Sequence, residues 1–361
     1  MPKPLSISAK ITGLKYKPLL VRELSVFDIG KIATAFDAAG SFLLDFSKEQ
    51  RVALSWWVSA KRTRTYPYAR VYDTLGFAGK KVTIIPVFKD EGKDGDRDFL
   101  QWDTVSLMSL LGVYTIIAYY TTAIPSARYK NKITDQRFDR EYLVLKLDEL
   151  LAYQSDALHW NLAQIDRVGT IAQRALDAYA NISSRLGIAM HSAASAERRV
   201  QELQKGKANF MQLSRNLAKS AQKREQLTRQ PKEKLSGRKG ILTIKNYLGG
   251  NYYLTSDEAK ISGNSIHLVE GKHTRSEMLP SVEDSKDGLI KMLLFSNLES
   301  AQVRTTGYRV MPILKLTGGR KFSVAGLSQA QRQMLAKLKQ EGQFNGFAVL
   351  INRRNLADIP L

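Results

Sequence analysis

The chain has 361 residues, of which 43% are hydrophobic and 25% are charged, and this composition is typical of a folded protein with one or two cores. Its 55 lysines and arginines against 34 acidic residues give a net charge of +21, which favours a polyanionic partner. The absence of cysteine excludes disulfides, thiolate metal sites and thiol nucleophiles, and the four histidines include no pair at metal-ligand spacing.

Region 1–135 is expected to be an α/β region. Its pattern predicts helices at 27–38 and 47–58, a strand at 81–88, and a buried helix at 104–111 followed by a buried strand at 113–120. Residues 104–127 carry no charge, but serines, threonines and a glycine interrupt them, so we expect no membrane span. The first residues also lack the apolar core of a signal peptide, which favours a cytoplasmic protein.

Basic and aromatic side chains alternate between residues 56 and 74. This pattern is expected of a loop that recognises DNA, because basic groups contact phosphates or guanine and aromatic rings stack on bases. The alternative is that Trp56 and Trp57 belong to the core and the arginines are solvated. The candidate DNA contacts in this loop are Lys61, Arg62, Arg64, Tyr66 and Arg70.

Region 136–236 is expected to be helical and basic. Residues 197–239 contain thirteen lysines and arginines against four glutamates. A helix with charge of one sign repels itself unless an anion is near, so we expect it to contact the DNA backbone rather than only solvent. The candidate contacts are Arg215, Lys219, Lys223 and Arg224.

Region 237–361 returns to strands, predicted at 240–247, 252–255, 265–269 and 309–316, with helices at 286–298 and 328–341. Residues 262–264 form a polar, glycine-containing turn that predicts a hairpin. Asp257 follows the first strand of that hairpin, and Glu270 and Lys272 follow the apolar run of the second. Because residues two apart share a face of a strand, Glu270 and Lys272 are expected to point the same way.

Asp257, twelve intervening residues and then Glu270, Gly271 and Lys272 resemble the signature of the PD-(D/E)XK nucleases, the superfamily that contains most type II restriction endonucleases. The resemblance covers residues 225–318 and implies a mixed central sheet with an αβββαβ core. Ser256 stands where a proline often precedes the aspartate, which leaves the choice between Asp257 and Glu258 open.

The resemblance implies a Mg²⁺-dependent, sequence-specific endonuclease that cleaves double-stranded DNA. Asp257, Glu270 and the carbonyl of Gly271 would hold the ion, and Lys272 would position or activate the attacking water. Glu225 or Glu233 is a candidate for a further acid. A homodimer is expected by symmetry, because palindromic sites demand two active sites.

Other interpretations remain open from the sequence. Glu-x-Lys occurs three times, at Glu91, Glu258 and Glu270, but only Glu270 follows an apolar strand with an acid upstream. Asp73 and Lys89 form a rival pair, although Val87 stands where the pattern requires an acid. The hairpin could also be structural in a non-catalytic DNA- or RNA-binding protein, or belong to a structure-specific repair nuclease.

Overall fold

The computed structural model of the chain describes residues 3–47, 50–60, 67–204, 212, 219, 222, 237–246 and 250–360. The chain divides into two compact units, which we call the terminal unit (residues 1–22 and 217–361) and the inserted unit (residues 23–216). This division differs from the three consecutive regions expected from the sequence, 1–135, 136–236 and 237–361. The helices that follow residue 139 pack on the sheet formed by the residues before it, so the first two regions share one core.

The inserted unit is built on a five-stranded sheet in the order β2-β3-β4-β5-β8. Its strands are β2 (Val26–Asp28), β3 (Ser41–Asp45), β4 (Arg51–Trp56), β5 (Lys81–Pro86) and β8 (Val113–Ala118). Strands β4, β5 and β8 are parallel, and β3 runs antiparallel to β4. Both β5 and β8 are buried along nearly their whole length, as is typical of parallel strands covered on both faces.

The helix expected at 47–58 is wrong, because those residues complete a β3–β4 hairpin. Short apolar runs do not distinguish a buried strand from a buried helix, and cross-strand pairing decides here.

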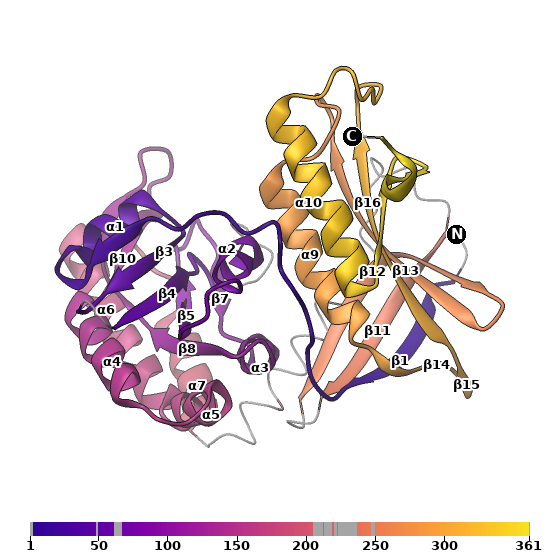
Figure 1. Ribbon diagram of the computed structural model, residues 1–361. Coiled ribbons are helices and arrows are strands. Elements are labelled where there is room, and N and C mark those ends of the chain that lie inside the picture. Colours follow the sequence, from indigo (N-terminus) through magenta and orange to yellow (C-terminus); the bar gives the residue numbers. More distant parts are fainter. Residues whose placement is uncertain are drawn as a thin grey trace. The chain divides into compact units, whose positions relative to one another are not determined.

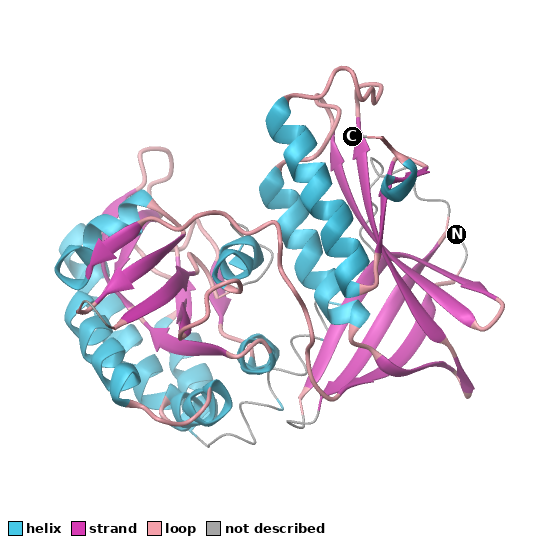
Figure 2. Cartoon of the chain, in the orientation of Figure 1, coloured by secondary structure: helices cyan, strands magenta, loops and turns pink. Residues whose placement is uncertain are grey.

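Helices flank this sheet, as Figure 2 shows. Helix α2 packs on β4, and α3 and α5 pack on β8. Asp139 and Asp156 cap α4 and α5 by accepting hydrogen bonds from main-chain N–H groups of the first turns. The helices are α1 (Ile32–Ala38), α2 (Pro67–Thr74), α3 (Trp102–Leu110), α4 (Arg140–Ala152), α5 (Ala157–Asp166), α6 (Val168–Leu186) and α7 (Ala193–Gln204), with a 3-10 turn at Ile29–Lys31.

Two short antiparallel ribbons complete the inserted unit. Strands β6 (Phe88–Asp90) and β7 (Arg97–Phe99) form one, and β9 (Tyr120–Pro125) and β10 (Ile133–Phe138) form the other. The first strand of each ribbon begins within two residues of the end of a central parallel strand, β5 or β8. Both ribbons therefore start from the carboxyl edge of the sheet, where parallel strands present their loops.

The terminal unit contains a nine-stranded mixed sheet in the order β15-β14-β1-β11-β12-β13-β16-β17-β18 (Figure 1). Strand β1 comes from the amino terminus and lies inside the sheet, parallel to β11 and antiparallel to β14. The strands are β1 (Leu5–Ile11), β11 (Arg238–Asn246), β12 (Asn251–Ser262), β13 (Ser265–Thr274), β14 (Glu299–Val303), β15 (Thr306–Gly307), β16 (Arg309–Gly318), β17 (Ala348–Ile351) and β18 (Arg354–Asn355), with a 3-10 turn at Leu356–Asp358.

Helices α9 (Val282–Ser296) and α10 (Gln329–Asn345) lie side by side over this sheet (Figure 1). Helix α9 packs on β13 and β16, which are parallel. Gly288 permits its close approach, because a Cβ there would lie 2.7 Å from Cδ1 of Leu314 and 3.3 Å from Cε of Lys272. The side chains of Leu314 and Lys272 therefore point from the sheet toward α9.

The predicted mixed α/β class is confirmed. Strands β11, β12 and β13, helix α9 and strand β16 occur in the order that the sequence predicted, but strands β14 and β15, which were not predicted, stand between α9 and β16. The helix that would lead an αβββαβ core falls largely outside the described residues. Among the described helices, none is long and apolar enough to cross a membrane.

Candidate active site

The hairpin of β12 and β13 brings two acids together. The strands pair in antiparallel register from Ser262 opposite Ser265 to Glu258 opposite Val269, and Asp257 and Glu270 are the next residues of the two strands. Oδ2 of Asp257 accepts a hydrogen bond of 2.7 Å from the main-chain N–H of Gly271. Because the register of β12 with β11 shifts between Ser256 and Ala259, the hydrogen bond from Gly271, and not strand alternation, places the Asp257 side chain next to Glu270. Of the two acids that the sequence left open, Asp257 is the one beside Glu270.

Glu270 is a buried carboxylate between two lysines, with a side chain only 4% exposed. Its Oε1 lies 3.1 Å from Nζ of Lys272, and its Oε2 accepts a hydrogen bond of 2.7 Å from Nζ of Lys291. A buried charge requires such partners, because an isolated one costs several kcal/mol of desolvation. As expected from strand alternation, Glu270 and Lys272 point to the same side.

Lys272 also contacts the helix above it. Its Nζ donates a hydrogen bond of 2.7 Å to Oδ2 of Asp287 on α9. The lysine is thus held between a carboxylate of its own strand and one of the facing helix. Two acids fix the direction of its ammonium group.

Sequence reasoning missed Asp287 and Lys291 as members of this cluster. Both lie on α9 four residues apart, so they share a face of the helix. The available signal was Lys291 itself, a charged residue inside the otherwise apolar run of residues 288–295. A lysine in such a run needs an anionic partner, and Glu270 provides it.

The pKa values of the cluster reflect competition between burial and charge. Burial alone would raise the pKa of Glu270, but the neighbouring ammonium groups of Lys291 and Lys272 outweigh burial and hold it below the ordinary value. Burial would lower the pKa of Lys272, but the carboxylates of Glu270 and Asp287 outweigh burial and raise it. The pKa of Lys291 is raised for the same reason, chiefly by Glu270 and then by Asp257. Glu270, Lys272 and Lys291 are therefore charged at neutral pH.

Most of the predicted DNA contacts lie outside the described residues. Lys219 is described and exposed, and its Nζ lies 5.6 Å from the ring centroid of Tyr253. Arg70 is described and half-buried, and its guanidinium lies 4.4 Å from the ring of Trp56 and donates to the carbonyl of that residue. The residues that are not described are Lys61, Arg62, Arg64, Tyr66, Arg215, Lys223 and Arg224, together with the candidate acids Glu225 and Glu233.

The aromatic residues around the 56–74 loop belong largely to the core. Trp57, Tyr68 and Tyr72 are buried, and Trp57 and Tyr68 pack edge to face. The core interpretation of the tryptophans therefore fits Trp57. The basic residues of the loop stay predicted DNA contacts.

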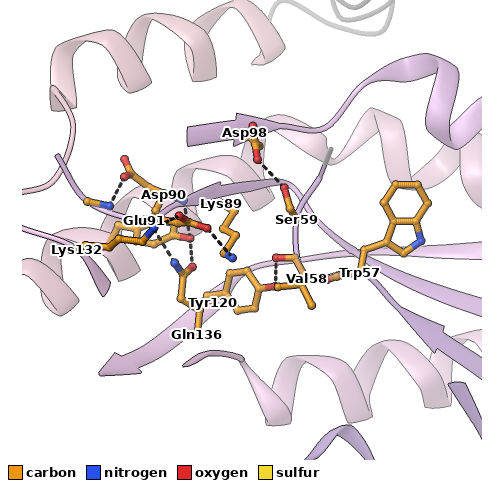
Figure 3. A network of polar contacts seen from close by, with 12 residues as sticks. Trp57, Val58, Ser59, Lys89, Asp90, Glu91, Asp98, Tyr120, Lys132 and Gln136 are labelled. Atoms are coloured by element: carbon orange, nitrogen blue, oxygen red, sulfur yellow. Dashed lines mark hydrogen bonds and ion pairs between the residues drawn. The ribbon is translucent and has the colours of Figure 1, made fainter. Parts of the chain in front are cut away.

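The rival pair in the inserted unit has a different environment. Lys89 lies on β6, where its Nζ is 3.0 Å from Oε1 of Glu91, and Nζ of Lys132 is 3.1 Å from the other oxygen of Glu91 (Figure 3). Asp73 is buried at the end of α2, and Val87 is a buried apolar residue. The acid that the pattern requires two residues before Lys89 is absent.

Within the described part of the chain, no three acidic or histidine side chains converge on one point as metal ligands. A cation held by Asp257 and Glu270 would therefore draw its remaining ligands from main-chain carbonyls, water and a bound phosphate. Comparisons with protein-family models, with curated proteins and with solved structures found no match to this chain.

Proposed function

We propose that this protein is a Mg²⁺-dependent, sequence-specific endonuclease that cleaves double-stranded DNA, with an active site of the PD-(D/E)XK type in the terminal unit. The observation that carries the proposal is the set of Asp257, Glu270 and Lys272 on adjacent strands, with Glu270 and Lys272 on one face. This set matches the predicted signature residue by residue.

The side chains present fit a hard divalent cation. Asp257, Glu270 and Asp287 are three carboxylates against the two ammonium groups of Lys272 and Lys291, so this cluster carries one net negative charge. Its donors are oxygen atoms, which Mg²⁺ prefers. Asp257 and Glu270 would hold the ion, with the carbonyl of Gly271 as a further ligand. The bound ion would stabilise negative charge on the phosphate and lower the pKa of a water.

The role of Lys272 follows from its protonation. Because its pKa is raised, it stays an ammonium at neutral pH and does not accept a proton from water. It donates hydrogen bonds instead, which supports a role in orienting the attacking water and stabilising the charge that develops on the phosphate. Asp287 positions this ammonium from α9.

The substrate class rests on charge. A net charge of +21 is far larger than solubility requires, and each phosphate neutralised by a lysine or arginine releases a counterion. We propose the basic residues around 197–239 and the 61–70 loop as the DNA-contacting surface. A homodimer would supply the two active sites that cutting both strands of a palindrome requires.

A digestion of supercoiled plasmid with and without Mg²⁺ tests the proposal. Wild-type protein should give discrete fragments only with Mg²⁺. Asp257→Asn, which keeps an oxygen acceptor for the Gly271 N–H but removes the charge, should slow cleavage on the order of a thousandfold. Asp358→Asn, the same change at an exposed position of the terminal unit, should cut as wild type does. Full cleavage by Asp257→Asn would move the active site elsewhere.

A second candidate function is non-catalytic nucleic-acid binding. It is favoured by one observation, that both oxygens of Glu270 already face lysine ammonium groups, as in a structural ion-pair network. The same digestion separates the candidates. Binding without any cutting identifies a binding protein, and cutting confined to junctions or flaps identifies a structure-specific nuclease.

A further inference from the structure

The ammonium group of Lys291 contacts one oxygen atom of the proposed metal site and a main-chain carbonyl close to it in the sequence. Its Nζ is 2.7 Å from Oε2 of Glu270 and 3.2 Å from the carbonyl oxygen of Thr255 on β12. Thr255 stands two residues before Asp257 on the same strand, and the carboxylate of Asp257 acts electrostatically on Lys291. Two carboxylates and a main-chain carbonyl form the kind of oxygen environment that holds a hard cation.

We propose that the ammonium of Lys291 occupies the cation position between Asp257 and Glu270, and that a divalent cation binds only when this ammonium moves away. The inference rests on the proposed function for the identity of the metal ligands. A Mg²⁺ ion binds a carboxylate oxygen at about 2.1 Å, and Oε2 of Glu270 cannot hold an ammonium and a divalent ion in contact without strong repulsion between the two cations.

The structure also provides a place for the displaced ammonium. Asp287 lies one helical turn before Lys291 on α9, the spacing at which an acid followed by a lysine forms an ion pair along a helix. At present Asp287 accepts a hydrogen bond from Lys272. When Lys291 forms an ion pair with Asp287, Lys272 loses its hydrogen bond to Asp287 and can donate to the water and the phosphate. Cation binding would thus exchange the partners of both lysines and switch the site from a closed ion-pair network to its active arrangement.

The inference predicts that removing the charge of Lys291 strengthens cation binding. Lys291→Met keeps the length and apolar stem of the side chain but leaves the position between the acids without a cation. In the absence of metal this variant should be less stable than wild type, because Glu270 keeps only Lys272 as a partner. With metal it should bind the ion more tightly, because no ammonium has to be displaced.

Calorimetric titration with Mg²⁺ alone, without DNA, tests this on the full-length chain, with thermal unfolding as a second readout. Lys291→Met should lower the dissociation constant for Mg²⁺ by about tenfold or more and enlarge the rise in melting temperature that Mg²⁺ produces. Lys337→Met, the same change at an exposed position of α10, should titrate as wild type does. Asp287→Asn, which removes the receiving carboxylate, should weaken binding of Mg²⁺.

The outcomes separate this inference from the proposed function. Equal Mg²⁺ affinity in wild type, Lys291→Met and Lys337→Met overturns the inference and leaves the nuclease proposal intact. Binding by Lys291→Met but not by wild type supports the occupied cation position and contradicts a Mg²⁺-dependent wild-type enzyme. Binding by none of the proteins overturns both. If Lys291→Met does not fold, unchanged affinity in Asp287→Asn is the result that overturns the exchange of partners.

Discussion

Each unit of this protein contains a cluster of buried ion pairs next to a parallel strand, and the two clusters differ in composition. In the inserted unit, the cluster after β5 draws its members from several segments, including β6, β7, the ribbon of β9 and β10, and the segment before α7 (Figure 3). Two acids, Asp90 and Glu91, pair with three basic groups and a histidine, so these ion pairs leave no excess of negative charge. The basic members are Lys89, Arg97, Lys132 and His191.

Polar side chains extend this network. Oδ2 of Asp98 accepts a hydrogen bond from Ser59, and the amide of Gln136 donates to the carbonyl of Asp90 (Figure 3). Tyr120 donates to the carbonyl of Val58. These contacts join loops that lie far apart in the sequence, as expected of a scaffold.

The cluster of the terminal unit draws its charged members from only three elements, β12, β13 and α9, and keeps one net negative charge. Acids that are outnumbered by basic partners tie segments together and leave no negative charge for a cation, whereas residual negative charge between adjacent strands provides a site for one. We therefore propose a scaffold role for the first cluster and a catalytic role for the second. The two cleavage experiments that follow compare a change in one cluster with the same change in the other.

The largest difference is expected between Glu270→Gln and Glu91→Gln in single-turnover cleavage. Loss of a metal ligand should slow Glu270→Gln on the order of a thousandfold, because the ion acts on the transition state. Glu91→Gln should cut at the wild-type rate once its folding has been verified by circular dichroism. The reverse result would place the active site in the inserted unit, with Asp73 and Lys89 as its next candidates.

A smaller difference in cleavage rate is expected between variants of Lys272 and Lys89. Lys272→Met is expected to slow single-turnover cleavage on the order of a hundredfold while DNA affinity stays near wild type, because an ammonium that orients water contributes after binding. Lys89→Met should lower the melting temperature without changing the cleavage rate of the folded protein. If Lys272→Met loses only stability, the terminal cluster is also a scaffold.

We expect buried carboxylates in both units to contribute to the loss of folding stability at acidic pH. The pKa values of Glu270 and Glu91 are held below the ordinary value for glutamate, in each case against the effect of burial, by neighbouring lysines. A carboxyl with a lowered folded-state pKa stabilises the protein above its unfolded pKa, and this contribution is lost as pH falls through the folded pKa. Urea unfolding at pH 7 and pH 3.5 should therefore show a smaller pH dependence in Glu270→Gln and in Glu91→Gln than in wild type.

Each unit of lowered pKa corresponds to about 1.4 kcal/mol in the free energy of unfolding. The effect should be larger for Glu270, the more buried of the two. If the free energy of unfolding of Glu270→Gln depends on pH as strongly as that of wild type, the lysines that contact Glu270 do not stabilise the folded state.

The smallest effect concerns single surface lysines in DNA binding. Lys219→Ala should flatten the slope of log K against log salt by roughly 0.9, the contribution of one phosphate contact. Lys130→Ala, an exposed lysine of the inserted unit, serves as its counterpart. Equal flattening by both would extend the DNA-contacting surface over the two units, and no change in Lys219→Ala would leave that residue facing solvent.

The sequence predicted the β12–β13 hairpin well, because local rules govern it. A glycine turn brings Asp257 and Glu270 together, alternation puts Glu270 and Lys272 on one face, and the predicted helices at 286–298 and 328–341 overlap α9 and α10. Asp287 and Lys291 were not identified, because their membership depends on which face of α9 meets β13. That orientation is a tertiary property, set by the close approach at Gly288.

Strand β1 was missed for a similar reason. Residues 5–11 alternate in burial, but they pair with β11, more than two hundred residues away, in a parallel register that no local pattern shows. Strand β3 was not predicted, and β4 was misread as part of a helix at 47–58, because its apolar run is short and buried.

The position of β1 determines the order in which the chain can fold during synthesis. These seven residues are synthesised before the inserted unit, yet their partners β11 and β14 appear only after the inserted unit is complete. The inserted unit can form its own core before β1 has a partner strand. The terminal sheet forms last, because its contacts join segments of long sequence separation and are slow to form. A fragment that starts at residue 217 would expose β11 and β14 as open edges and would tend to aggregate. The sheet that holds β12 and β13 is therefore completed by a strand that was synthesised before the whole inserted unit.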